Sequence, residues 1–129
     1  MAAQVKVVHP QDCRVEASSG AMTRVEGISE ILTGAKGIHL AVATVPPGQR
    51  SSAHWHVNCE SAIYVMSGHG LFLTGEGLRE ELAIGPGDFL YVPPEAIHAP
   101  VNNGTEPLVL IVARNAPTEI VVEYDPSKS

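Results

Sequence analysis

The sequence has few basic residues and few cysteines, and each shortage excludes a class of function. Lysine and arginine number 8 against 14 aspartate and glutamate residues, which gives a formal net charge of −6. A nucleic-acid partner would need a basic stripe, and none is visible. Cys13 and Cys59 form neither a CxxC pair nor a disulfide ladder. Two isolated cysteines are typical of a reducing compartment, so we predict a cytoplasmic protein.

Long apolar runs and long helical segments are also missing. Nowhere do about 18 apolar residues follow one another, and residues 1–6 lack the apolar run of a signal peptide, so no membrane partner is expected. Between Gly68 and Gly104 no run free of Gly and Pro exceeds seven residues, which leaves no room for an ordinary helix. The chain has 129 residues, 44% of them hydrophobic, which is enough for one domain with a core.

What the sequence does contain is a series of short apolar runs separated by turn residues. Residues 38–45 form a β-rich run that Pro46-Pro47-Gly48 closes, and residues 108–113 form the last long one. Several shorter runs lie between them, separated by Gly, Pro, Asn and Asp. Such spacing predicts an all-β sandwich or barrel.

Two stretches within this pattern carry metal-binding side chains. The first contains His54, His56 and Glu60 between Gly48 and Gly68, and the second contains His98 between Gly87 and Asn102. Alternation along a strand puts His54 and His56 on one face, and Glu60 has the same parity. His98 is distant in sequence, and a neighbouring antiparallel strand would bring it in. Imidazole and carboxylate ligands without thiolate suit Fe, Mn, Ni, Cu or Zn and argue against a structural zinc knot.

These two stretches resemble the motifs of the cupin family, G-x5-H-x-H-x3/4-E-x6-G and G-x5-P-x-G-x2-H-x3-N. The resemblance implies a double-stranded β-helix (jelly-roll) barrel and one metal held by His54, His56, Glu60 and His98. Two positions depart from the motifs: seven residues separate Glu60 from Gly68, and Glu95 stands where the family has Gly. We interpret Glu95 as part of an altered, exposed turn. The expected domain limits are an arm at residues 1–20, a barrel at 21–125 and a tail at 126–129. In small cupins such an arm often pairs with a second subunit, which implies a homodimer; a loose terminus is the competing interpretation.

Other side chains are weaker candidates for the substrate pocket. Ala62, Tyr64 and Met66 share the parity of Glu60, while Pro100 and Asn102 share that of His98. Core packing is the competing interpretation for Ala62 and Met66. Arg50 could hold a substrate carboxylate, and a solvated loop position explains it equally well. His39 could face the pocket from its strand. Cys59 lies beside Glu60, but no basic group activates it.

Three functions remain open on this evidence. Four protein ligands would leave two positions of a six-coordinate metal free for substrate and oxygen or water, so we favour a dioxygenase-type oxidoreductase that uses Fe or Mn. The alternatives are an isomerase or lyase that uses the metal as a Lewis acid on a sugar or keto acid, and a binding protein without catalysis. The sequence offers no clear general base, and it identifies no catalytic residue beyond the metal ligands. A small oxygenated molecule is the expected substrate.

Overall fold

The computed structural model describes residues 3–16 and 19–125, and two antiparallel sheets dominate it. The larger sheet has the strand order β1-β2-β3-β10-β5-β8. Its strands are β1 (Arg14–Glu16), β2 (Thr23–Ile28), β3 (His39–Val45), β5 (Ser61–Ser67), β8 (Phe89–Val92) and β10 (Leu108–Arg114). The smaller sheet has the order β11-β4-β9-β6-β7. Its strands are β4 (His54–His56), β6 (Gly70–Thr74), β7 (Glu80–Ile84), β9 (His98–Val101) and β11 (Val121–Glu123).

The helices are short, as the density of Gly and Pro predicts. They are η1 (Pro10–Asp12), α1 (Glu30–Thr33) and η2 (Glu76–Leu78). Ser29 caps α1 because its hydroxyl accepts a hydrogen bond from Leu32 N at 3.1 Å, and Gly34 ends it in the left-handed conformation. Within the described ranges, no helix has the length and hydropathy that crossing a membrane requires.

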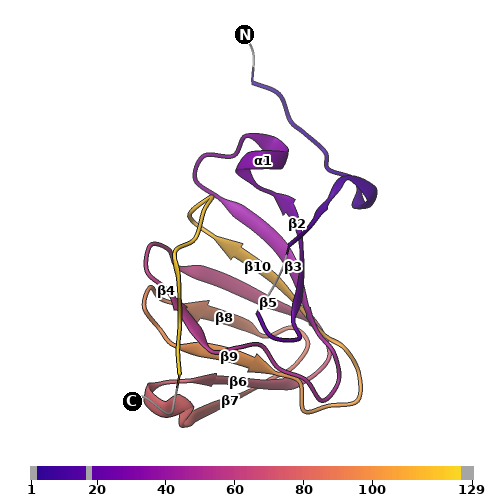
Figure 1. Ribbon diagram of the computed structural model, residues 1–129. Coiled ribbons are helices and arrows are strands. Elements are labelled where there is room, and N and C mark those ends of the chain that lie inside the picture. The colour runs from indigo at the N-terminus through magenta and orange to yellow at the C-terminus, as the bar shows by residue number, and fades with distance from the viewer. Residues whose placement is uncertain (1–2, 17–18, 126–129) are drawn as a thin grey trace.

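Hydrophobic residues from both sheets fill the space between them. The most deeply buried large side chains are those of Val45, Val65, Leu108 and Leu110. Alternation explains their positions, because β3 and β5 both begin with a buried residue and then alternate exposed and buried positions. In Figure 1 the two sheets face each other, with the smaller sheet at the lower left. The fold is the predicted all-β jelly-roll barrel.

The turn between β5 and β6 shows why glycine is needed at one motif position. Gly68 has a φ of 84°, a value that side chains disfavour, and a Cβ there would overlap the carbonyl oxygen of Pro107. The sequence Ser67-Gly68-His69-Gly70 predicts a hairpin turn, and this prediction is wrong: β5 belongs to the larger sheet and β6 to the smaller one, so the turn connects the two sheets and the two strands do not pair.

The expected N-terminal arm, residues 1–20, does not form one unit: part of it pairs with the barrel and part of it extends away. Residues 14–16 are not separate from the barrel, because β1 pairs with β2 in the register Arg14↔Glu26, Val15↔Val25 and Glu16↔Arg24. Residues 3–13 lead away from the barrel at the top of Figure 1. Pairing of this segment with a second subunit stays a prediction, and the expected tail at residues 126–129 lies outside the described residues.

Candidate functional site

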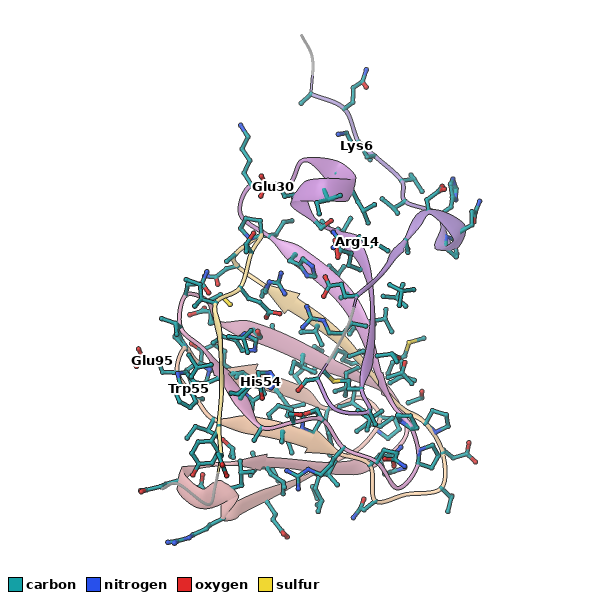
Figure 2. All side chains as sticks on the ribbon, in the orientation of Figure 1. Lys6, Arg14, Glu30, His54, Trp55 and Glu95 are labelled. Carbon is teal, nitrogen blue, oxygen red and sulfur yellow. The ribbon has the colours of Figure 1, made fainter. Side chains whose placement is uncertain are left out.

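Two adjacent strands of the smaller sheet bring three histidines together. His54 and His56 are both buried on one face of β4, and His98 of β9 is the register partner of His54. One ring nitrogen from each lies within 4.8 Å of the other two. Figure 2 shows His54 over the barrel interior, whereas Trp55 lies at its edge. Strand alternation therefore aims three imidazoles at one point, as the spacing predicts.

The partners of the Nδ1 atoms decide which ring nitrogens can bind a metal. His54 Nδ1 lies 2.9 Å from the carbonyl oxygen of Ser52, and His98 Nδ1 lies 2.8 Å from that of Ala96. A carbonyl oxygen can only accept, so Nδ1 carries the proton in both rings and the Nε2 lone pair is free. Burial lowers the pKa of His54, and it lowers that of His98 to about 4. Both rings are therefore neutral at pH 7, which is the form that binds a metal.

His56 has a carboxylate as its partner. Its Nδ1 lies 2.9 Å from Oε2 of Glu119, although the contact lacks the direction of a good hydrogen bond and Nδ1 has no other partner among the described residues. Glu119 also lies 3.2 Å from each of Arg24 and Arg114. Burial opposes ionisation of Glu119, but the His56 contact and the two guanidinium groups outweigh it and lower the pKa to about 2. An ionised carboxylate behind a metal-binding histidine orients the ring and raises its basicity.

A small cavity of about 50 Å³ lies against the three histidines. This is room for roughly three or four water molecules. The walls include Met22, Arg24, His39, Ala41, Ser61, Phe72, Pro100, Arg114 and Glu119. The ring of Phe72 stacks on that of His98 with an interplanar angle of 6°, so one side of the site is apolar. The donor set, the fixed tautomers and the burial all fit a transition metal.

Glu60 does not join this group. Glu60 lies just before β5, and its side chain is exposed on the side away from the histidines. There Tyr91 donates a hydrogen bond to Glu60 Oε2 at 3.2 Å. Ser61, the next residue, is buried and lines the cavity instead. The motif itself explains the shift: the family's six-residue gap before Gly68 points to position 61 rather than 60. The chain therefore has a hydroxyl at the position that faces the histidines.

The same one-residue shift removes two of the proposed pocket residues. Tyr64 and Met66 have the parity of Glu60, and both are exposed on the outer face of β5, 37% and 58% respectively. A slip of one position exchanges the two faces of a strand. Arg50 is exposed and does not line the cavity. Asn102 is fully buried but structural, because its amide donates to the carbonyl oxygens of Val45 and Glu106. Pro100 does line the cavity, as its parity with His98 predicts.

Position 95 keeps the backbone conformation that glycine would favour. Glu95 has a φ of 68°, so the interpretation of an altered turn is wrong, although the side chain is exposed as expected. Its N–H donates to the carbonyl oxygen of His56 at 2.8 Å, which ties this turn to β4.

Cys59 is buried, and burial raises the pKa of its thiol, so the structure gives it no reactive character.

The two sequence motifs do not include the polar residues that surround the histidines. Glu119, Arg24 and Arg114 lie far from both motifs in sequence and come from three different segments. No spacing rule identifies them, because only the tertiary fold brings them together. His39 is the exception, since its alternation within a strand allows it to face the pocket, and it does line the cavity.

Comparison with known proteins agrees with this architecture. The cupin domain family model matches residues 41–114. The polyketide cyclase RemF from Streptomyces resistomycificus has the same fold, with a TM-score of 0.79 and 21% identity over 95% of this chain and 87% of its own. An Acidithiobacillus ferrooxidans protein provisionally described as a sugar phosphate isomerase has 30% identity and a TM-score of 0.64, over 82% of this chain and 67% of its own.

Relatives by sequence cover less of the chain. A glucose-6-phosphate isomerase of Thermococcus kodakarensis is 37% identical over 47% of this chain and 34% of its own length. The matched region spans between 34% and 60% of the first curated relatives. The family match includes β4 and β9 and therefore all three histidines. On the evidence of its motifs, its two sheets and this match over more than half its length, the chain belongs to the cupin family.

Proposed function

We propose that this chain is a metal-dependent enzyme that uses a Lewis-acidic metal to move a proton on a small carbonyl compound. The observation that carries the proposal is the convergence of three buried imidazoles on one cavity, with a fixed ionised carboxylate behind one of them. His54, His56 and His98 would hold the metal, and Glu119 would orient His56. When bound, the metal polarises a carbonyl oxygen and stabilises the negative charge that develops there.

The ligand set also bears on which metal is native. Without Glu60, the described residues supply three neutral nitrogen ligands at this point and no anionic one. Imidazole suits Fe, Zn, Ni and Cu, whereas Mn prefers carboxylate and water oxygens. We therefore infer Fe, Zn, Ni or Cu rather than Mn. The neutral ligands leave the metal's full positive charge for the substrate, which favours polarisation of a carbonyl group.

The side chains that line the cavity suit a small oxygenated substrate. Arg24 and Arg114 both line its wall, and each has a side chain that is no more than 12% exposed. Phe72 and Ile63 cover the apolar side and limit the access of water. Two similar proteins are described as isomerases of sugar phosphates, and we propose a substrate of the same class for this chain.

A dioxygenase is the second candidate. Three protein ligands leave enough open positions on a six-coordinate metal for both substrate and oxygen. Proton transfer needs a general base, and His39 and Glu119 both line the cavity as candidates for that role.

The deciding experiment is an assay of the purified protein with each metal, under air and under argon. Metal content is measured first, and the probes are glucose 6-phosphate, pyruvate and acetoacetate in D₂O. Proton transfer predicts deuterium at the carbon beside the carbonyl under argon with Zn or Fe. Product formation that requires oxygen and fails with Zn would instead establish the dioxygenase.

We also propose a homodimer that forms through the outer face of the larger sheet. One row of apolar side chains crosses this face in register, from Val25 through Val42, Ile111 and Tyr64 to Phe89. Phe89 is 81% exposed and its ring lies 4.9 Å from that of Tyr64. Exposed apolar patches mark interfaces. Two copies that each carry a charge of −6 would associate best through an uncharged face.

A further inference from the structure

His39 links the metal-binding cavity to a second polar cluster that the proposed function has not used. The cluster consists of His39 and the carboxylates of Glu16 and Glu26, and one ligand atom from each lies within 4.8 Å of the other two. His39 and Glu26 are 3% and 2% exposed. His39 lines the 50 Å³ cavity beside the histidines and also a second cavity of about 280 Å³ whose walls include Glu16 and Glu26.

The contact between His39 and Glu16 fixes the role of each ring nitrogen. His39 Nε2 lies 3.2 Å from Oε1 of Glu16. With Glu16 ionised, Nε2 carries the proton and donates it to the carboxylate, so the Nδ1 lone pair is the one left to act in the cavity. This pairing of an imidazole with a carboxylate is the arrangement that orients a general base in many enzymes.

Charged groups from every neighbouring strand act on this pair. Glu16 belongs to β1, Arg24 and Glu26 to β2, and Arg114 to β10, with Glu119 close behind. Burial, together with Arg114 and Arg24, lowers the pKa of His39 to about 4. Burial and the neighbouring Glu26 raise the pKa of Glu16 to about 7. His39 is therefore unprotonated at neutral pH, and Glu16 exchanges its proton near that pH.

We propose that His39 is the general base of the reaction and that Glu16 receives the proton from it. This inference rests on the proposed function. The C–H bond beside the substrate carbonyl breaks, its electron pair forms the enolate, and the proton binds His39 Nδ1. The Nε2 proton moves to Glu16 Oε1, which leaves a neutral imidazole. The reverse transfer returns a proton to the neighbouring carbon or oxygen, so no oxidant or reductant is needed.

A second metal ion is the competing use of the same three residues. The arginines argue against it, because Arg24 lies 3.0 Å from Glu16 and Arg14 lies 3.9 Å from Glu26. These two cations already balance the two carboxylates. A divalent ion added between them would leave an excess of positive charge in a buried site.

The test compares His39→Gln, Glu16→Gln and the exposed control His9→Gln, each with its measured metal content. Deuterium incorporation into glucose 6-phosphate, pyruvate and acetoacetate is followed by NMR. We expect His39→Gln to lower the rate about 100-fold or more at unchanged metal content, mainly in kcat, while His9→Gln has no effect. In the unmodified protein the rate should rise with pH through about 7, as Glu16 loses its proton. Glu16→Gln should lower the rate and abolish this rise.

Four results would overturn the inference, and they can be told apart. If the unmodified protein exchanges deuterium and His39→Gln retains its rate, His39 is not the base. If the unmodified protein exchanges none of the probes, the proposed function fails and the inference fails with it. If the protein binds two metal ions and Glu26→Gln loses one, the cluster is a metal site. The pH profile of the unmodified protein needs no substitution, and a flat profile from about pH 5 to about pH 9 would also refute the role of Glu16.

Discussion

The carboxylate that supports the metal site is Glu119 rather than Glu60, and this assignment can be tested directly. Glu119→Gln keeps the size of the side chain and an acceptor oxygen, but it removes the charge that lies 2.9 Å from His56 Nδ1. Removal of such an outer partner weakens metal binding by about 10- to 100-fold. Because glutamine can still accept a hydrogen bond, we expect the lower end of the range, about tenfold or about 1.4 kcal/mol.

The same loss has a measurable thermal consequence. A metal that binds only the native protein stabilises it in proportion to the logarithm of its affinity. For 129 residues the entropy of unfolding is about 0.27 kcal/mol per degree, so a loss of about 1.4 kcal/mol reduces the metal-induced rise in Tm by about 5 °C. The rise is compared within each variant, with and without metal, because Arg24 and Arg114 also lose a partner.

The matched control is Glu60→Gln, which changes an exposed carboxylate that contacts Tyr91. Its affinity for metal, measured by competition with a chromogenic chelator, should stay within about twofold of the original. The reasoning fails if Glu60→Gln loses the metal and Glu119→Gln keeps it, since Glu60 would then be a ligand and the outward orientation of its side chain would not hold in the metal-bound protein.

Four further predictions follow from the same geometry. His98→Ala should remove most bound metal, measured by elemental analysis, because His98 is one of the three ligands that converge among the described residues. Ser61→Glu places a carboxylate in the cavity and should tighten metal binding at least about tenfold, whereas Ser61→Gln should not. Glu95→Gly should raise the free energy of unfolding by about 0.5 kcal/mol in a urea titration, because relief of the positive φ exceeds the entropic cost of glycine. Phe89→Lys places a charge in the apolar row and should convert a dimer into a monomer in light scattering, and an unchanged mass would exclude this face as the interface.

The features of the fold that could be predicted are those that depend on local rules. Alternation in β3 and β4 correctly placed His54 and His56 on the buried face, and the turn residues correctly marked the ends of the strands. Strand β11 and the pairing of β1 with β2 were not predicted, because both depend on which distant segments meet. Arg24 and Glu119 lie 3.2 Å apart but come from opposite ends of the chain, so no local pattern could indicate their contact.

The error at Glu60 shows how far parity can be extended. Counting from His56 assumes that the strand continues without interruption, but β4 ends at His56 and β5 begins at Ser61. A turn between two strands can shift the alternation by one residue, so the count must start again inside β5. Gly68 fixes that count, because its φ of 84° and its contact with Pro107 allow no other residue at the end of the strand. Counted back from Gly68 over the family's six-residue gap, the ligand position is Ser61, which lies with Ile63 and Val65 on the buried side of β5. The motif's gap to Gly68 therefore locates the position that faces the metal site better than the parity of the histidine pair does, and in this chain that position is Ser61.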